Sequence, residues 1–130
     1  MKQDAERRAR DALKPYGYYH PEIVTELVRV SDERWRLNMR VRRGPAVKIT
    51  EASISIRGDG AESTRLQEWR AEWPLTEGKT INQATWRQEK DRALEIAAAE
   101  GYLLAKYAEH VIELDLVRNE ARLALVLDTG

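Results

Sequence analysis

The feature that most constrains the fold is a Gly-Tyr pair that occurs twice, each time between a helical pattern and a strand-like run. The pair that starts at Gly17 ends a helical pattern at residues 4–16, and the pair that starts at Gly101 ends one at residues 82–100. Glycine is favoured just after a helix because it adopts the left-handed conformation without a Cβ clash. Each pair therefore predicts the end of a helix and the start of an extended segment.

Two strand-like runs follow each Gly-Tyr pair. Residues 23–30 are rich in β-branched side chains, and residues 34–42 (RWRLNMRVR) alternate strictly between apolar and polar side chains. The apolar face of the second run consists of Trp35, Leu37, Met39 and Val41. After the other pair come residues 110–117 (HVIELDLV) and 121–128 (ARLALVLD). A period of two is typical of a half-buried strand, so each pair of runs predicts a hairpin.

Between the hairpins the pattern predicts a strand and two helices. Residues 47–56 change phase near residues 50–51, which indicates a β-bulge. Leu66, Trp69 and Trp73 have helical spacing and are followed by Pro74. Asn82 is the predicted N-cap of the long second helix.

The order of elements indicates an internal repeat. Shifting the chain by 84 residues lays Gly17 on Gly101 and Ala9 on Ala93. We therefore interpret residues 1–45 as the C-terminal part of one unit and residues 46–130 as a complete second unit.

Composition excludes several functional classes. The chain has 22 basic and 22 acidic residues, so no net charge favours nucleic acid or an anionic membrane. It has no cysteine, which excludes disulfides and thiolate chemistry. No apolar run approaches ~18 residues, and the start MKQDAERRAR is not a signal peptide, so export would require a leader that has been removed.

The unit resembles the POTRA (polypeptide-transport-associated) domain. The residues that carry the likeness are GPAVKITEASISIRGDG, PLTEGKTINQATWRQEKDRALEIAAAEGYLLAKY and HVIELDLVRNEARLALVLDTG. Within the family, the likeness is greatest to the barrel subunit of the translocation and assembly module, whose domains end in a similar DTG or DSG. The resemblance implies an α+β fold, β-α-α-β-β, with a three-stranded mixed sheet and two helices on one face. Here a partial module, α-β-β, precedes the complete one.

In this family the last strand of the module lies in the middle of the sheet, so the preceding strand lies at an edge. A free edge can accept an extended segment of another protein by strand addition. The resemblance thus implies a partner-binding edge at His110, Val111, Ile112, Glu113, Leu114, Asp115, Leu116 and Val117. Charges at Glu113 and Asp115 fit equally well with simple protection of the edge from aggregation. The residues that could line a groove beside it are Tyr18, Tyr19, Tyr102 and Tyr107, although tyrosines at such helix-to-strand corners more often close the end of the core.

A second candidate surface is a basic face on the first hairpin. It consists of Arg34, Arg36, Arg40 and Arg42, joined in this interpretation by Arg7, Arg8 and Arg10 of the preceding helix. As a binding surface it would contact an acidic client, a partner subunit or anionic lipid. The alternative interpretation is that these arginines form an ordinary solvated sheet face without a partner. We expect no nucleic-acid binding, because the tryptophans fall in predicted core stripes. Because the partial module lacks its first strand, we expect a homodimer through strand pairing or swapping, or pairing of residues 47–56 with both sheets.

No catalytic, metal or cofactor site is predicted. His20 and His110 stand far apart without neighbouring ligands, and the carboxylates at Asp91, Glu95, Glu100 and Glu109 fall on solvated faces. The GDG sequence at residues 58–60 lacks the lysine and glycine spacing of a phosphate-binding loop and is interpreted as a turn.

The resulting hypothesis is a non-catalytic periplasmic scaffold of an outer-membrane protein assembly or autotransporter secretion machine. Its partners would be unfolded outer-membrane client segments and an inner-membrane subunit of the translocation module. Two alternatives stay open. One is a ferredoxin-like α+β domain that binds nucleic acid or an acidic protein through its arginine face. The other is an enzyme subunit whose catalytic residues lie outside this sequence.

Overall fold

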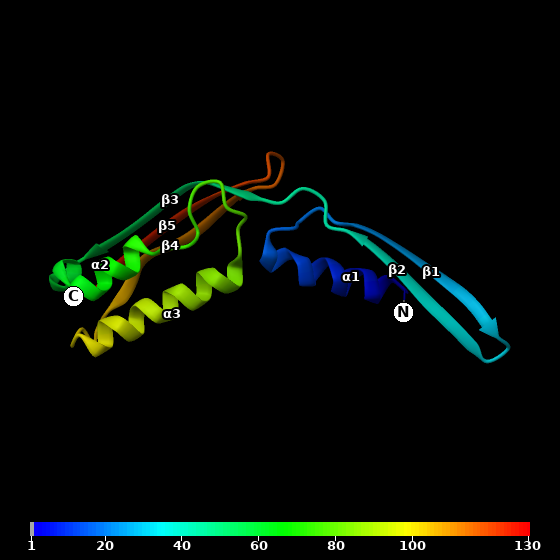
Figure 1. Cartoon of the computed structure of the whole chain (residues 1–130), viewed down its shortest axis with the longest axis horizontal. Coiled ribbons are helices and arrows are strands. Elements are labelled where there is room, and N and C mark those ends of the chain that lie inside the picture. The colour runs from blue at the N-terminus through cyan, green and yellow to red at the C-terminus, as the bar shows by residue number, and fades with distance from the viewer. Residues whose placement is uncertain (1) are drawn as a thin grey trace.

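The computed structural model describes residues 2–130 and consists of two parts arranged end to end (Figure 1). The helices are α1 (Lys2–Leu13), α2 (Thr64–Ala71) and α3 (Gln83–Ala99), with short 3-10 turns η1 (Lys14–Tyr16) and η2 (Asp59–Glu62). The strands are β1 (Glu22–Ser31), β2 (Arg34–Arg42), β3 (Lys48–Arg57), β4 (Lys106–Asp115) and β5 (Glu120–Asp128). Within residues 2–130 no helix has the length and apolar character needed to cross a bilayer.

The C-terminal part is a mixed sheet with the order β3-β5-β4. β3 runs parallel to β5, and β4 runs antiparallel to it. Helices α2 and α3 lie on the same face of this sheet (Figure 1). This arrangement confirms the predicted α+β fold, with the last strand of the chain in the middle of the sheet.

The core of this part forms between the two helices and the inner face of β5. Leu123, Leu125 and Leu127 are almost completely buried, and full burial of such a side chain stabilises the fold by roughly 1.5–3 kcal/mol. Ala93 and Ala97 of α3 have no exposed surface, because α3 packs closely against the sheet where its side chains are small. The helices thereby cover the apolar face of β5.

Three tryptophans fill the space between α2 and α3. The rings of Trp69 and Trp73 meet edge to face at 5.6 Å, and those of Trp73 and Trp86 at 5.7 Å. Edge-to-face contacts of this kind are stabilising beyond their buried area. Trp73 lies beyond the end of α2 at Ala71, so the predicted apolar stripe continues past the helix itself.

Local sequence signals account for the ends of the helices. The Asn82 side chain accepts a hydrogen bond from the Thr85 amide at 3.1 Å, which confirms the predicted N-cap. Gly101 has a φ of 95°, as predicted for the residue after α3. The bulge in β3 falls between Ile49 and Glu51, also as predicted. It keeps Ile49 on the core side although the pattern changes phase there.

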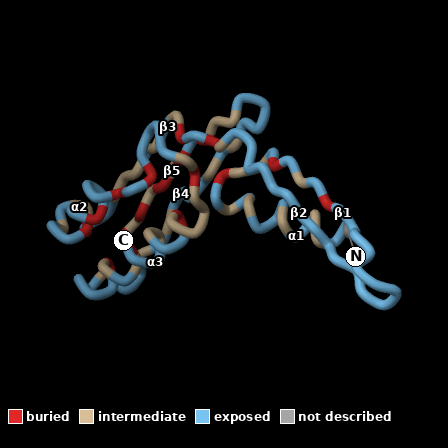
Figure 2. Tube along the Cα trace, turned by 45° about the vertical axis from the view of Figure 1, so that its right-hand side comes forward, coloured by how far each residue is buried: buried red, intermediate tan, exposed pale blue. Residues whose placement is uncertain are grey.

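The N-terminal part is much less buried than the C-terminal part (Figure 2). Helix α1 lies beside the β1–β2 hairpin, whose register places Thr25 opposite Met39 and Leu27 opposite Leu37. Thr25 is the one buried residue of the two strands, and its hydroxyl donates to Glu6 of α1. Trp35 is 62% exposed, so the expectation that it belongs to a core stripe is wrong. One helix does not cover the apolar face, whereas two helices cover the corresponding face of β5.

Direct hydrogen bonds form the junction of the two parts. The Val47 backbone amide donates to the Gly17 carbonyl at 2.8 Å, and Nε2 of the Gln83 side chain donates to the Tyr19 hydroxyl at 2.6 Å. β3 pairs with β5 and with no strand of the first hairpin, so the idea that residues 47–56 pair with both sheets is wrong. The two sheets are separate, and the junction rests on loops.

Candidate functional site

The candidate site is the edge strand β4. It spans Lys106–Asp115, so the predicted range of residues 110–117 is displaced towards the C-terminus. The prediction missed the first residues of the strand, because a bulge between Tyr107 and Glu109 breaks the alternation by which a strand is recognised in a sequence. It ends earlier because the Asp115 carboxylate accepts the amides of Val117 and Arg118, each at 3.1 Å. Leu116 and Val117 therefore belong to the turn.

One row of β4 backbone groups pairs with β5, and the other row lies at the edge of the sheet. In β5 the odd-numbered residues bond to β3, as the bond from the Thr129 amide to the Arg57 carbonyl shows. The even-numbered residues consequently bond to Glu109, Val111 and Glu113, their partners in the register. The outward N–H and C=O groups are those of His110, Ile112 and Leu114. Within residues 2–130 no second strand pairs with this edge.

The side chains of β4 alternate between the helix face and the open face of the sheet. His110, Ile112 and Leu114 stand opposite Leu125, Leu123 and Ala121, on the face that packs against α3. On the open face are Val111, which is 47% exposed, Glu113 and Asp115. The edge thus combines free backbone groups with apolar side chains of its own.

A cation cluster connects α3 to the edge. The ammonium group of Lys90 lies 5.7 Å from the centre of the Trp86 ring and 5.3 Å from that of the Tyr107 ring. It also lies 2.7 Å from Nδ1 of His110, which must accept because an ammonium group only donates. Sequence reasoning missed Lys90, although its position four residues after Trp86 places both on one face of α3.

Tyr107 fixes this cluster to the helix. Its hydroxyl donates to the Lys90 carbonyl at 2.6 Å, and its ring stacks on His110 with centres 6.0 Å apart. Burial raises the pKa of the Tyr107 phenol well above its ordinary value, with further contributions from Asp91 and Glu89. Tyr107 therefore stays a neutral hydrogen-bond donor over the physiological pH range.

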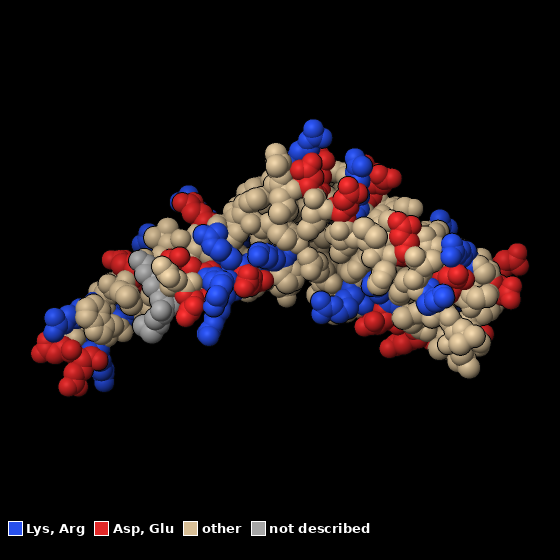
Figure 3. Space-filling model, turned by 180° about the vertical axis from the view of Figure 1, so that it is seen from behind, with Lys and Arg blue, Asp and Glu red and all other residues tan. Residues whose placement is uncertain are grey.

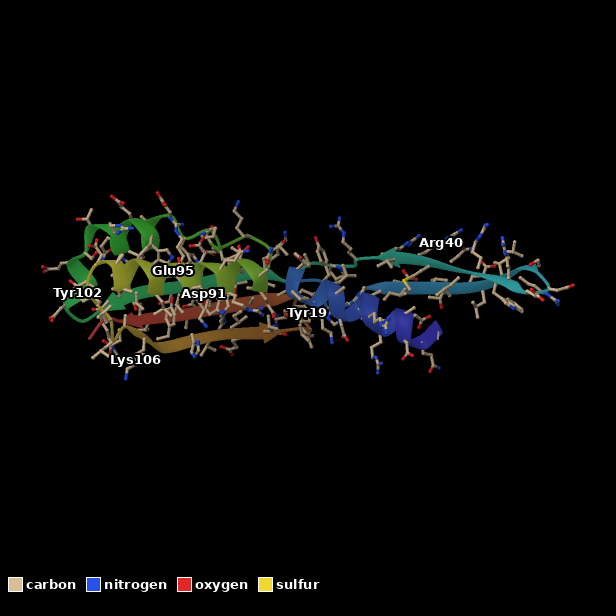
Figure 4. All side chains as sticks on the ribbon, turned by 90° about the horizontal axis from the view of Figure 1, so that it is seen from below. Tyr19, Arg40, Asp91, Glu95, Tyr102 and Lys106 are labelled. Atoms are coloured by element: carbon tan, nitrogen blue, oxygen red, sulfur yellow. The ribbon has the colours of Figure 1, made fainter. Side chains whose placement is uncertain are left out.

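The other three tyrosines do not line the edge, and the alternative that they close the end of the core describes them better. Tyr18 receives the Arg43 guanidinium 5.0 Å from its ring centre, and Tyr19 lies at the junction (Figure 4). Tyr102 lies at the far end of α3, where its hydroxyl donates to the Asp59 carbonyl (Figure 4). Tyr102 thus covers one end of the core, and Tyr18 and Tyr19 pack at the junction of the two parts.

The basic face of the hairpin is exposed but mixed in charge. The register places Arg36, Arg40 and Arg42 opposite Val28, Val24 and Glu22, and Glu26 lies on the same face. Figure 3 likewise shows acidic and basic side chains interspersed on one side of the molecule. Within residues 2–130, Arg34, Arg36, Arg40 and Arg42 form no salt bridge.

The arginines of α1 do not extend this basic face. The bond between Glu6 and Thr25 places α1 on the Thr25 face of the hairpin, whereas Arg40 belongs to the opposite face. Arg7 pairs with Asp4, and Arg10 donates to the Pro21 carbonyl. The expectation that they join the strand arginines is therefore wrong.

The GDG segment is a closed turn. The Thr129 hydroxyl accepts the Gly60 amide at 2.8 Å, and the Asp59 amide donates to the Gly130 carbonyl at 3.0 Å. These amides are consequently unavailable to an anion. In the part of the chain that the structure describes, no group of three or more potential ligand side chains is placed to hold a metal ion.

Comparison with solved structures assigns the fold to the POTRA class. The chain resembles POTRA domains 3–5 of BamA from Haemophilus influenzae with a TM-score of 0.55 and 19% identity, over 98% of this chain and 50% of that one. POTRA domains 1–2 of Omp85 from Anabaena give a TM-score of 0.44 and 14% identity, over 95% of this chain and 72% of that one. No curated protein sequence matches significantly.

A family model matches the N-terminal part of the chain. Residues 1–43 match the model described as POTRA domain, TamA domain 1. The C-terminal part and the solved structure thus share the POTRA fold, as the sequence predicted, and residues 1–43 are similar to the first POTRA domain of TamA. The chain spans half the length of the BamA structure that it resembles.

Proposed function

We propose that this protein is a non-catalytic periplasmic scaffold of an outer-membrane protein assembly machine of the Omp85 type, most similar to TamA. The POTRA fold and the match of residues 1–43 support this proposal. The clients would be unfolded segments of outer-membrane or autotransporter proteins, and an inner-membrane subunit of the translocation module would be a partner.

The observation that carries the binding proposal is the free edge of β4. Its outward backbone groups at His110, Ile112 and Leu114 are able to pair with an extended segment of almost any sequence. Helix α3 lies beside this edge and presents the Lys90 ammonium group, held over Trp86. Backbone pairing suits many clients, and the ammonium group adds a preference for carboxylates near the edge.

NMR titration of the labelled protein with a peptide from an outer-membrane β-strand tests this proposal. We expect the largest amide shifts at His110, Ile112 and Leu114, and smaller ones at the amides of Val111 and Glu113, which already pair with β5. Peptide that is N-methylated on the residues facing β4 should not bind, because strand addition needs those donors. Unchanged amides along β4 at millimolar peptide would contradict the proposal.

We further propose that residues 1–45 are the C-terminal part of a first POTRA unit and residues 46–130 a complete second one. In the complete unit, β3 pairs in parallel with the last strand, β5. The last strand of the first unit is β2, so a strand equivalent to β3 would pair with the outer edge of β2, the edge that does not pair with β1. Trp35 and Val41 are exposed beside it. A second copy of the chain is the proposed occupant. Sedimentation at high concentration should show a dimer, and a monomer with a well-ordered hairpin would contradict this pairing.

The alternative of nucleic-acid binding by the hairpin is less well supported. The arginines occupy one face of the hairpin, and the exposed ring of Trp35 belongs to the other face, with Leu37. Aromatic stacking and phosphate contacts would therefore occur on opposite sides.

A further inference from the structure

A groove of about 590 Å³ lies along the outer edge of β3, at the opposite side of the sheet from β4. Its walls are β3, α2 and the segment that follows α2. The lining residues used below are Glu51, Ala52, Ile54, Arg70 and Glu77. The volume falls within the range of ligand-binding pockets in proteins.

The first part of the β3 edge is already paired. Ile49 donates to the Lys79 carbonyl and accepts from the Gly78 amide, both at 2.8 Å. Ile81 donates to the Val47 carbonyl at 2.9 Å, and the bridge formed by Thr80 is antiparallel. Residues 78–81 thus act as a short antiparallel partner, which covers the edge only before the bulge.

Beyond the bulge the edge is open except at one carbonyl. The bond from Thr129 to Arg57 shows that odd-numbered residues of this stretch bond to β5, so the backbone groups of Ala52 and Ile54 point outward. The Arg70 guanidinium donates from Nε to the Ile54 carbonyl at 2.6 Å. Among residues 2–130, Arg70 forms no salt bridge, so its charge is available to a ligand.

We propose that this groove is a second strand-addition site, and that it binds an extended peptide antiparallel to β3 with an acidic residue preceding a basic one. The antiparallel direction continues the pairing begun by residues 78–81. In that direction the peptide passes Arg70 first and then Glu51 and Glu77. At about 3.3 Å per residue, the three positions from Ile54 to Glu51 place the two peptide charges about three residues apart.

Arg70 then has two roles in the same groove. Without a ligand it covers the Ile54 carbonyl, which protects a free edge from unspecific pairing. When an acidic peptide binds, the guanidinium transfers to the carboxylate, and the carbonyl pairs with the peptide backbone. A charge-assisted pair of this kind is stronger than the bond to a neutral carbonyl.

The test compares two short acetylated and amidated peptides of alternating valine and threonine. One has glutamate three positions before lysine, and the other has the same residues in the reversed order. NMR titration of the full chain should show shifts at Ala52 and Ile54 with the first peptide and about tenfold weaker binding of the second. Equal affinities, or no shifts at Ala52 and Ile54, would overturn the proposal.

Variants separate the role of Arg70 from a general effect of charge. Arg70→Gln should abolish the preference between the two peptides, whereas Arg65→Gln, an exposed arginine on the same helix outside the groove, should retain it. An unchanged preference in Arg70→Gln would contradict the assigned role. Shifts confined to His110, Ile112 and Leu114 would support the β4 site alone and refute this one, so the two proposals fail independently.

Discussion

The imidazole Nε2 of His20 lies 2.8 Å from the carbonyl oxygen of Leu116, although 96 positions separate them in the chain. This hydrogen bond joins the loop before β1 to the turn between β4 and β5, and so connects the two parts of the molecule. Because a carbonyl only accepts, Nε2 carries the proton. The turn that ends the candidate binding strand therefore also contributes to the junction.

Removing this bond should loosen the orientation of the two parts more than it lowers stability. For His20→Ala we expect a decrease in the free energy of unfolding of about 1 kcal/mol or less, because the bond is exposed. Residual dipolar couplings should show wider relative motion of the two parts. His20→Gln retains a donor and should preserve part of the order. Identical couplings in the wild type and His20→Ala would contradict this role.

Gly17 should be far less tolerant of a side chain than Gly78. Both have φ near 90°, which costs alanine roughly 1–2 kcal/mol in either place. A Cβ at Gly17 would also lie 2.7 Å from the Ile81 carbonyl oxygen and 2.8 Å from Cγ2 of Thr80, whereas a Cβ at Gly78 meets nothing within 4 Å. Urea denaturation should show a larger loss for Gly17→Ala than for Gly78→Ala. Equal losses would show that the junction adapts without cost.

The Thr129 hydroxyl should be needed for the turn that closes the end of β3. It accepts the Gly60 amide at 2.8 Å and donates to the Arg57 carbonyl at 3.0 Å, in a residue only 3% exposed. Thr129→Val keeps the shape but leaves the buried amide unsatisfied, at a cost of about 1–3 kcal/mol. Thr129→Ser retains the hydroxyl and should be less destabilised. A valine variant as stable as the serine variant would refute this explanation.

Asp128 should contribute to stability in a pH-dependent way. The Gly130 amide, which donates to the carboxylate at 3.0 Å, lowers the pKa of Asp128, and Arg57 lowers it further. A pKa lowered by folding gives stabilisation that is complete above the ordinary value of 3.8 and is lost as the pH falls through the folded value. Asp128→Asn should therefore be less stable than the wild type at pH 7, with a smaller difference at pH 2. A difference that is independent of pH would contradict this explanation.

Signals within a few neighbouring residues could be read from the sequence. Asn82 caps α3 through a bond to an amide three residues away, and Gly101 ends it through its own backbone conformation. The bulge near Thr50 appears as a phase change in an alternating pattern. The order of the strands followed from the likeness to POTRA domains and not from the periodicity itself.

The candidate site could be predicted only in outline. An edge strand in the second half of the chain was expected, but its start at Lys106 was missed because the bulge at Tyr107 removes the alternation. The contact between Lys90 and His110 joins residues from different elements, and no local pattern specifies that they meet. The same holds for Arg70 and the β3 edge.

The sequence by itself determined where α3 begins and ends, where β3 bends and which side chains share a face, because these depend on backbone conformation and spacing along one segment. Tertiary structure alone decided which of those faces is covered. Trp35 and Leu125 belong to equally regular alternating strands, yet Trp35 is 62% exposed and Leu125 is fully buried. Burial requires a second surface at packing distance. Two helices provide that surface for β5, and α1 does not provide it along the whole of β2.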